Sequence, residues 1–424
     1  MIRLSLFLSI FAAAACEKQN PLYCEGHPTD PSCTSIDAMP DSSTGCTNDT
    51  QCSAPTAVCE TATGACVPCT SAEPTACTGT TPICGSDDTC DACTAHSQCA
   101  SDVCRPDGSC SDGGDVAYVD PAGTDNTTCT KAMPCTSVAK ALATNRPYVK
   151  FTGTTSEQVT IDNQNVTLLA DSGAQLTYSM AGVILTVTGT SNVAIYDLEI
   201  ANGLGATGVG VSMQTGNTAT LTLQRVKVAN NGGAGISTSD GSLTVLQSVI
   251  SGNTGGGLSL SSTSFTLLNN FIFQNGGPSS LVGGIDLAGV ATTGAHQLDF
   301  NTITANDGAA TVNSGVNCGT VTAPINFDSN IIYGNTVSSG GQQLGGSVNC
   351  TATYSDIGPD TATGSGNINA DPMFVSTTTP DDHITAGSPC RDAADPAATL
   401  DIDVDGDTRP QGSGRDIGAD EYKP

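Results

Sequence analysis

The chain has 424 residues, of which 4% are aromatic, none is Trp and 48 are Gly, and this composition disfavours an ordinary globular core. Only 13% of the residues are charged, and few residues have the long side chains that favour helices, so an extensively helical protein is disfavoured. The formal net charge of -28 argues against nucleic acid or anionic lipid as a partner, because binding either needs a basic surface.

The N-terminus has the order of an export signal. Arg3 supplies a positive start, Leu4 to Phe11 form an apolar run too short to span a bilayer, and small residues precede Cys16. The arrangement Ala-Ala-Ala-Cys resembles a bacterial lipoprotein signal, which implies a signal peptide over residues 1–15 and an acylated Cys16. The alternative is plain secretion. Both interpretations place the mature protein outside the cytoplasm, and the first anchors it by lipid to the outer membrane or cell surface.

Two regions without a repeat of apolar residues follow. Residues 16–45 are polar and contain several Pro, which predicts a flexible tether in which Cys24 and Cys33 can close a loop. Residues 46–110 hold twelve cysteines in three groups of four: Cys46, Cys52, Cys59, Cys66; Cys69, Cys77, Cys84, Cys90; and Cys93, Cys99, Cys104, Cys110. An exported chain with 20 Cys is expected to form disulfides, and we predict two bridges within each group.

The cysteine-rich region has almost no apolar residues of its own, so cross-links must supply the order that burial cannot. It resembles the small disulfide knots of exported proteins, including EGF-like modules. The CxxC pairs, Cys66 with Cys69 and Cys90 with Cys93, also suggest zinc, but zinc-ribbon spacing and a reducing compartment are both missing.

The pattern of residues changes near residue 116. The sequence Tyr118-Val119-Asp120-Pro121 leads to Cys129 and Cys135, which we expect to pin a loop, and then to a short predicted helix over Ser137–Thr144. Thr136 is the expected cap of this helix, which we expect to cover the open end of a β-solenoid. This opening resembles that of bacterial right-handed parallel β-helix proteins of the pectate-lyase-like superfamily.

One eleven-residue pattern then recurs five times between Leu221 and Asn335. Its terminal Asn residues are 22, 22, 31 and 29 positions apart, which fits solenoid coils with inserted loops. The copies are LTLQRVKVANN, LTVLQSVISGN, FTLLNNFIFQN, HQLDFNTITAN and INFDSNIIYGN. Together with the resemblance, they predict an all-β fold, a right-handed parallel β-helix over residues 116–375, preceded by the small disulfide-rich region.

The columns of the aligned copies indicate what each position does. Alternating apolar columns predict two short strands joined by a bend in each copy. Two Asn columns mark the bends, one exemplified by Asn270 and the other by Asn275. We expect Asn to adopt the left-handed backbone of a tight bend and to form amide ladders between coils. Sugar binding is a weaker interpretation of these residues.

The end of the chain carries its most specific motif. Residues 376–424 include D-x-D-G-D-x-R-P and a G-x-D-I-G-A-x-E-Y ending, and they resemble the closing segment of bacterial β-helix surface proteins. We predict that this segment caps the solenoid. Cys318 and Cys350 stand in consecutive loops and can pair, whereas Cys390 is the odd thiol if Cys16 is acylated.

Candidate catalytic residues are few. The resemblance to the pectate-lyase-like superfamily implies lyase chemistry with Ca²⁺ and a basic residue. Only Arg225 and Lys227 are available on the coils after Phe151. A position on a solvated strand face accounts for these two residues better than a catalytic role. Asp299 and Asp328 share one column of neighbouring coils, so their carboxyl groups should lie near one strand spacing apart, as a hydrolase would require.

A calcium site is a second candidate. Asp401, Asp403, Asp405 and Asp407 alternate around Gly406 as in a Ca²⁺ loop, although Gly412 stands where an EF-hand has its bidentate Glu. A capping turn with solvated Asp side chains is the alternative. No other cofactor is indicated by the sequence.

These observations lead to a functional hypothesis. We predict an exported, lipid-anchored surface protein whose β-helix binds polysaccharide or another cell-envelope component without catalysis. The first alternative is a polysaccharide-degrading enzyme, a glycoside hydrolase or lyase, that uses Asp299 and Asp328. The second is a purely structural envelope component.

Overall fold

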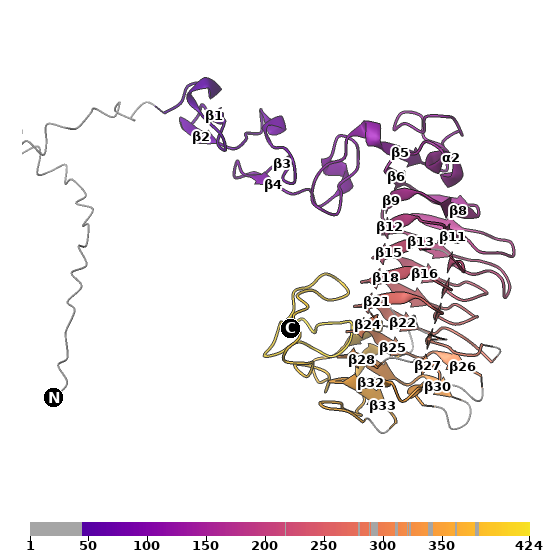
Figure 1. Ribbon diagram of the computed structural model, residues 1–424. Helices are drawn as coiled ribbons and strands as arrows, with labels where there is room; N and C mark the ends of the chain where they lie inside the picture. Colours follow the sequence, from indigo (N-terminus) through magenta and orange to yellow (C-terminus); the bar gives the residue numbers. More distant parts are fainter. Residues whose placement is uncertain are drawn as a thin grey trace, which may run out of the picture. The chain divides into compact units, whose positions relative to one another are not determined.

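The computed structural model describes residues 45–424 except 217, 279, 288, 290–295, 310–312, 320, 322–323, 338–341, 361–362 and 378–380 (Figure 1). The chain divides into two compact units, the first ending at Ala92 and the second beginning at Cys93. The predicted signal peptide and residues 16–44 of the predicted tether, with Cys16, Cys24 and Cys33, lie outside the described residues. None of the described helices combines the length and apolar character that a membrane crossing needs.

The described part of the first unit, residues 45–92, is held together by disulfides. Its elements are η1 (Asp49–Gln51), β1 (Val58–Glu60), β2 (Ala65–Val67), η2 (Pro74–Ala76), β3 (Ile83–Cys84) and β4 (Cys90–Asp91). Strands β1 and β2 form one hairpin, and β3 and β4 form another. The bridges join Cys46 to Cys59, Cys52 to Cys66, Cys69 to Cys84, and Cys77 to Cys90. Each group therefore links its first cysteine to its third and its second to its fourth.

The third group of cysteines, which we call the third module (Cys93–Cys110), belongs to the second unit. It contains η3 (His96–Gln98) and the bridges Cys93–Cys104 and Cys99–Cys110. Val103 packs with residues of the first coils, and the Tyr118 hydroxyl donates a hydrogen bond to the Ser101 carbonyl at 2.6 Å. The last four of the twelve cysteines are thus fixed to the β-helix.

Three parallel sheets run along the coils of the second unit, and each complete coil adds one strand to each sheet (Figure 1). Within the described residues, the first sheet contains β5 (Val116–Val119), β6 (Tyr148–Phe151), β9 (Asn165–Ala170), β12 (Asn192–Tyr196), β15 (Thr220–Gln224), β18 (Ser242–Leu246), β21 (Ser264–Leu268), β24 (His296–Asp299), β28 (Ile325–Asp328) and β32 (Cys350–Thr353). The second contains β7 (Thr154–Ser156), β10 (Gln175–Thr177), β13 (Glu199–Ala201), β16 (Lys227–Ala229), β19 (Val249–Ser251), β22 (Phe271–Phe273), β25 (Thr302–Thr304), β29 (Ile331–Tyr333) and β33 (Asp356–Gly358).

The third sheet was not predicted. It contains β8 (Val159–Asp162), β11 (Leu185–Thr188), β14 (Val211–Met213), β17 (Ile236–Thr238), β20 (Leu258–Leu260), β23 (Ile285–Leu287), β27 (Val316–Cys318) and β31 (Leu344–Gly346). These strands lie between the eleven-residue copies, where a short apolar-x-apolar signal is present but weak. The copies themselves form strands of the first two sheets, as β15 and β16 show.

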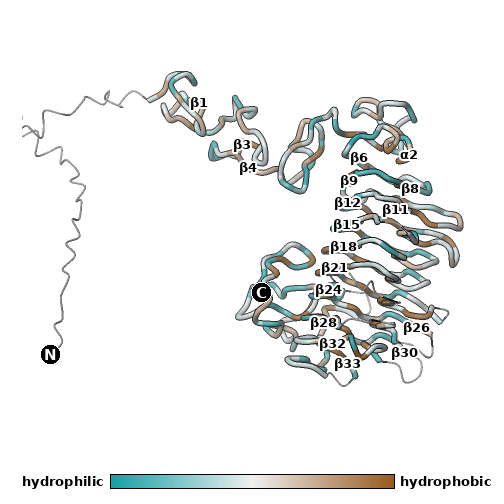
Figure 2. Tube along the Cα trace, in the orientation of Figure 1, coloured by the Kyte–Doolittle hydropathy of each residue, from teal (hydrophilic) through white to brown (hydrophobic). Residues whose placement is uncertain are grey.

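The interior of the coils is a continuous stack of apolar side chains. Residues aligned in the copies are paired in register, for example Leu221 with Leu243 and Val228 with Ile250. Figure 2 shows apolar stretches recurring from coil to coil. Cys318, at the end of β27, forms a disulfide with Cys350, at the start of β32.

The Asn columns form two buried ladders that follow the stack. Asn253 Nδ2 donates to Asn275 Oδ1 at 2.8 Å, and Asn275 Nδ2 donates to Asn306 Oδ1 at 3.0 Å. A second ladder links Asn270 to Asn301 at 2.8 Å. The predicted backbone role is wrong, because the left-handed residue is the one before the Asn, such as Asn269 (φ 53°) or Gln274 (φ 53°). The Asn side chains therefore satisfy buried amides, while their neighbours make the bend.

A short helix, α2 (Val138–Leu142), lies beside the first coils and buries Val138, Ala141 and Leu142. Its cap is Ser137, whose hydroxyl accepts from the Lys140 N–H, so the prediction of Thr136 is wrong. Asp125 instead accepts hydrogen bonds from the backbone N–H groups of Thr136 and Ser137. The bridge Cys129–Cys135 closes the preceding loop.

The end of the chain, which we call the closing segment (residues 381–424), lies along the side of the coils (Figure 1). Two small sheets accompany it and the last loops: β34 (Phe374–Ser376) with β35 (Asp381–Ile384), and β26 (Asp307–Gly308) with β30 (Thr336–Val337). Its contacts reach the bends between the first two sheets, where the Arg409 guanidinium stacks on Phe300 and the Gly418 N–H donates to the Ser329 carbonyl. The segment predicted to cap the solenoid therefore contacts the side of the coils.

Candidate functional site

The two aspartates that the sequence selected are neighbours. Asp299 ends β24, Asp328 ends β28, and the two residues are paired in the sheet. Asp299 Oδ1 accepts a hydrogen bond from the Asp328 backbone N–H at 3.0 Å, and its Oδ2 accepts from Gln297 Nε2 at 2.7 Å. Asp328 Oδ1 accepts from the Ser329 hydroxyl at 2.9 Å. Parallel strands in register thus bring the carboxyl groups together as predicted from the repeat.

The closing segment converts this strand edge into a cleft of about 490 Å³, which we call the acidic cleft. Asp395 and Asp401 add a third and a fourth carboxyl group to its lining, and the Asp395 backbone N–H donates to the Ser329 hydroxyl at 3.1 Å. Asp395 was missed by the sequence analysis. It stands in an irregular segment about 70 residues after Asp328, and nothing in its local pattern indicates contact with a coil.

Burial controls the protonation of this site. It raises the pKa of Asp299, and it raises the pKa of Asp328 to about 6, with further raising contributions from a hydrogen bond to Asp395 and from its charge. A carboxyl group with a pKa near 6 can act as a general acid close to neutral pH. The residues that line the cleft, all within the described part of the chain, include no Lys, Arg or His.

The basic residues considered for lyase chemistry are already paired. Arg225 makes two hydrogen bonds to Asp197, at 2.7 and 2.9 Å, and Lys227 Nζ lies 3.1 Å from a Glu199 carboxylate oxygen. Both partners come from the preceding coil. These pairs account for both cations without a catalytic role.

The four aspartates of the candidate Ca²⁺ loop point to different partners. Asp403 is buried, and its Oδ1 accepts from the N–H groups of Asp405 and Asp407. Asp401 pairs with Arg415 at 3.1 Å, Asp405 with His383 at 2.8 Å, and Asp407 with Lys423 at 2.8 Å. This arrangement is that of a structural turn. Calcium binding by the loop stays a prediction, and calorimetry with Ca²⁺ and with EGTA tests it, because an unchanged Tm would exclude it.

The cysteines of the two CxxC pairs are consumed by four different disulfides: Cys66 bonds to Cys52, Cys69 to Cys84, Cys90 to Cys77 and Cys93 to Cys104. A zinc site there would require their reduction. Cys390 is the free cysteine of the described residues. It is buried, and its thiol donates to Asp356 Oδ2 at 3.3 Å.

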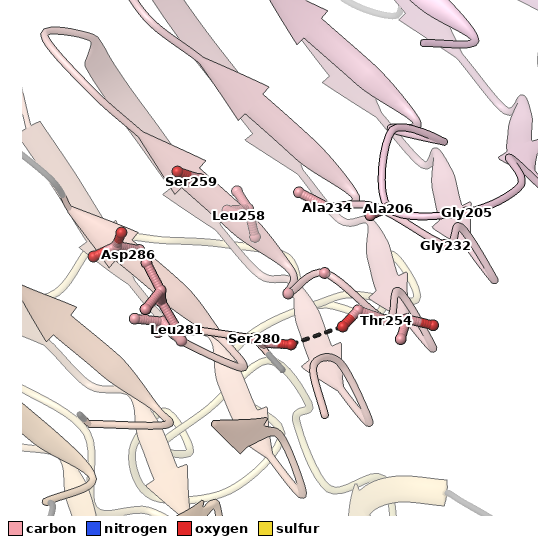
Figure 3. Close-up of a pocket in the computed structure, with 13 residues that line it drawn as sticks. Gly205, Ala206, Gly232, Ala234, Thr254, Leu258, Ser259, Ser280, Leu281 and Asp286 are labelled. Carbon is pink, nitrogen blue, oxygen red and sulfur yellow. Dashed lines mark hydrogen bonds between the residues drawn. The ribbon is translucent and has the colours of Figure 1, made fainter. Parts of the chain in front are cut away.

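A separate groove of about 560 Å³, which we call the corner groove, lies where the chain passes from the second sheet to the third (Figure 3). Its floor consists of Gly and Ala residues, because successive turns approach closely: a Cβ on Gly232 would lie 2.6 Å from the Gly205 backbone nitrogen. Ser259, Asp286 and Thr254 supply polar groups, and the Leu281 side chain is 73% exposed.

A match to a protein-family model agrees with this architecture. A family model described as a right handed beta helix region matches residues 148–275. The fold is a right-handed parallel β-helix. The solved structure of pectate lyase Pel9A has 15% identity and a TM-score of 0.47, covering 73% of this chain and 96% of that chain. A pectin methylesterase mutant with a bound hexasaccharide has 12% identity and a TM-score of 0.36, covering 60% and 92%. No curated protein sequence matches this chain.

Proposed function

We propose that this chain is an exported surface protein that binds polysaccharide in the corner groove without cleaving it. The many disulfides support export, and the lipoprotein-type sequence supports anchoring through Cys16. The observation that carries the binding role is a row of polar side chains leading into the groove.

That row lies on the outer face of the third sheet. Ser212, Ser237, Ser259, Asp286 and Asn317 are paired in register from strand to strand. Parallel strands place such residues about 4.8 Å apart, so hydroxyl, carboxylate and amide groups repeat at a spacing comparable to a sugar ring. Asn317 Nδ2 donates to Asp286 Oδ1 at 2.8 Å, which fixes the carboxylate at the groove.

The floor of the groove suits the less polar face of a sugar. The exposed Leu281 stands beside the Gly and Ala floor, and Ser280 is held by a hydrogen bond to the Thr254 carbonyl at 2.7 Å (Figure 3). Small residues permit close approach, while a few polar groups fix orientation, as is usual in ligand sites.

Filling the groove tests the proposal. Ser259→Trp should abolish retention on the glycans that the unaltered protein binds on an array, because the indole would stand between the in-register neighbours Ser237 and Asp286 on the outer face of the sheet. Thr244→Trp, on the outer face of β18 and outside the groove, is the matched control and should bind normally. Equal binding by both variants would remove the groove from the function, and no retention of any glycan by the unaltered protein would support a purely structural role.

The acidic cleft supports a second candidate function, hydrolysis of a polysaccharide. Its supporting observation is the set of four carboxyl groups in the lining, Asp299, Asp328, Asp395 and Asp401, of which Asp328 has its pKa raised to about 6. A depolymerisation screen on acidic and neutral polysaccharides tests this candidate. Activity that is lost in Asp299→Asn and Asp328→Asn would replace the binding proposal with an enzymatic one.

A further inference from the structure

A cavity of about 790 Å³, which we call the module cavity, lies between the third module and the first coils. The module contributes Thr94, His96 and Arg105 to its lining, and the coils contribute Asp171, Asp197 and Arg225. Neither the acidic cleft nor the corner groove shares a residue with it. Its size is in the range of small-molecule sites.

The walls of this cavity are fixed before any ligand arrives. The Cys93–Cys104 disulfide lies in one wall, and Lys131 Nζ donates to the Ala100 carbonyl of the module at 3.0 Å. The contact between Tyr118 and Ser101 joins the module to the first strand of the β-helix. A preorganised site loses little conformational entropy on binding, so a small polar ligand can be held by few contacts.

The lining of the cavity carries two guanidinium groups, those of Arg105 and Arg225, and two carboxylates, those of Asp171 and Asp197. The Arg225 guanidinium is paired with Asp197 through two hydrogen bonds, and the buried Lys150 behind the lining forms an ion pair with Asp171. Arg105 has no such partner: its Nε lies 3.9 Å from Asp107, beyond hydrogen-bond distance, and its Nη1 contacts the Tyr148 hydroxyl at 3.4 Å. Arg105 is therefore more weakly paired than Arg225, and its buried Nε has no hydrogen-bond partner among the described residues.

The distribution of basic and acidic residues along the chain favours anion binding at the module cavity over the later coils. No Lys or Arg stands in the sequence between Lys227 and Arg391, whereas ten Asp do. The later coils thus repel anions, while Arg105, Lys150 and Arg225 gather at the first coils. In a chain of net charge -28, Arg105 is thus one of the few basic groups that an anion can reach, and Asp171 and Asp197 stand in the same lining.

We propose that the module cavity binds a small polyhydroxylated ligand that carries an oxyanion, with Arg105 as its main charge partner and Arg225 as the second. The shared chemistry is a carboxylate, sulfate or phosphate group that accepts hydrogen bonds from guanidinium N–H groups. Thr94, Ser97 and Gln224 in the lining offer hydrogen bonds to the hydroxyl groups of the ligand. The proposal goes beyond the corner groove and does not depend on it.

Matched hexoses test this proposal and identify the oxyanion. Isothermal titration calorimetry of the purified protein at low ionic strength would compare glucuronate, glucose 6-sulfate and glucose 6-phosphate with glucose. We expect at least one anionic hexose to bind at least about tenfold more tightly than glucose, because a charge-assisted hydrogen bond is lost with the neutral sugar. The affinity should fall as NaCl is added. Equal affinity for glucose, or no binding of any anionic hexose, would overturn the proposal.

Three substitutions distinguish a specific contact with Arg105 from a general effect of positive charge. Arg105→Gln should weaken binding about tenfold or more, and Arg105→Lys should retain part of the affinity. Lys227→Gln removes the same charge from a nearby coil but lies outside the cavity, so its effect should stay within about twofold. Equal losses in Arg105→Gln and Lys227→Gln would contradict a specific site. Unchanged binding in Ser259→Trp distinguishes this cavity from the corner groove, and the Tm of each variant reports its folding.

Discussion

Two buried polar regions of this protein are built in opposite ways. The ladders inside the coils consist of neutral Asn side chains, in which each amide meets the next at about the same distance, 2.8 Å for both Asn231–Asn253 and Asn253–Asn275. The contact between the coils and the closing segment, which we call the seam, is ionisable instead. Among the described residues there, the buried acidic side chains are Asp356, Asp382, Asp403, Asp416, Asp420 and Glu421, and the buried cation is Arg409.

The difference has a physical consequence. A neutral ladder loses no charge hydration when it is buried, so it orders the coils at all ordinary pH values. The seam must offset the burial of several carboxyl groups, and it does so with one guanidinium, backbone N–H donors and bound protons. Coil stability and seam stability should therefore respond differently to mutation and to pH.

The largest expected effect follows from removing the buried cation of the seam. Arg409 donates to the carbonyl groups of Asp416, Gly418 and Ala419 and lies 3.4 Å from Glu421. Arg409→Met leaves these acceptors and the nearby carboxylates unpaired, which should cost about 3–5 kcal/mol. Hydrogen exchange should show the closing segment opening while the ladders stay protected.

Arg391 provides the control for that substitution. Its guanidinium stacks on Tyr422 at 4.5 Å and is only partly buried. Arg391→Met should cost less than about 1 kcal/mol. Equal destabilisation by the two substitutions, measured by denaturant unfolding, would mean that burial of Arg409 has no special importance at the seam.

A ladder residue should give the next largest effect. Asn275 Nδ2 donates to the Ile250 carbonyl at 2.8 Å and to Asn306, and Asn275 Oδ1 accepts from Asn253. Asn275→Ala leaves buried partners on both sides unsatisfied and should cost about 2–4 kcal/mol. Asn326→Ala, at an exposed strand position, should cost less than about 0.5 kcal/mol. A similar loss at both positions in chemical denaturation would contradict the ladder argument.

The repeat explains why the coils could be predicted and the seam could not. Five copies in register show which columns are apolar and which are Asn, so the fold, the inward Ile250 and Ile272, and the pairing of Asp299 with Asp328 all follow from spacing. Asp395 and Arg409 have no repeat partner. Their positions depend on how an irregular segment meets the bends at Ser329 and Phe300, and no periodicity encodes that contact.

The predicted role of the Asn backbone failed for a related reason. A column of Asn is compatible with a left-handed bend and with an amide ladder, and the sequence does not separate these two roles. The structure does, because the residue before the Asn has the positive φ, and that position accepts residues as different as Phe300 and Ala305. Side-chain identity is selective only at the amide position, where buried donors and acceptors must be matched.

The smallest expected effect is a pH dependence confined to the seam. Burial raises the pKa of Asp328, Asp356 and Asp420 to about 6 and that of Asp382 to about 7, and neighbouring carboxyl groups add to each shift. A carboxyl group with a raised pKa in the folded state holds its proton more tightly when folded. Its contribution to stability is therefore complete below about pH 4 and is lost as the pH rises through 6 to 7.

His383 acts in the same direction over a higher range. Its pKa is raised to about 10, first by the hydrogen bond to Asp405 and also by the one to Asp381, so the stabilisation by its charge is lost as the pH rises from about 6.5 toward 10. Asp405 opposes this trend only at low pH. The hydrogen bond to His383 lowers the pKa of Asp405, so the stabilisation by its carboxylate is lost only as the pH falls below the usual pKa of an Asp side chain. Between pH 5 and 8 the seam should weaken as the pH rises.

Asp328→Asn tests the part of this dependence that arises at the acidic cleft. The amide keeps the shape of the side chain but cannot lose a proton, so the variant should be less destabilised than the unaltered protein when the pH is raised from 5 to 8. Thermal unfolding at several pH values measures the difference, and hydrogen exchange assigns it to the closing segment. Asp240→Asn, at a partly exposed position on a coil turn, is the control and should leave the pH dependence unchanged. Parallel pH curves for Asp328→Asn and the unaltered protein would show that Asp328 does not carry a proton at the seam, and solvent screening would then have to weaken the repulsion between Asp328 and Asp395 instead.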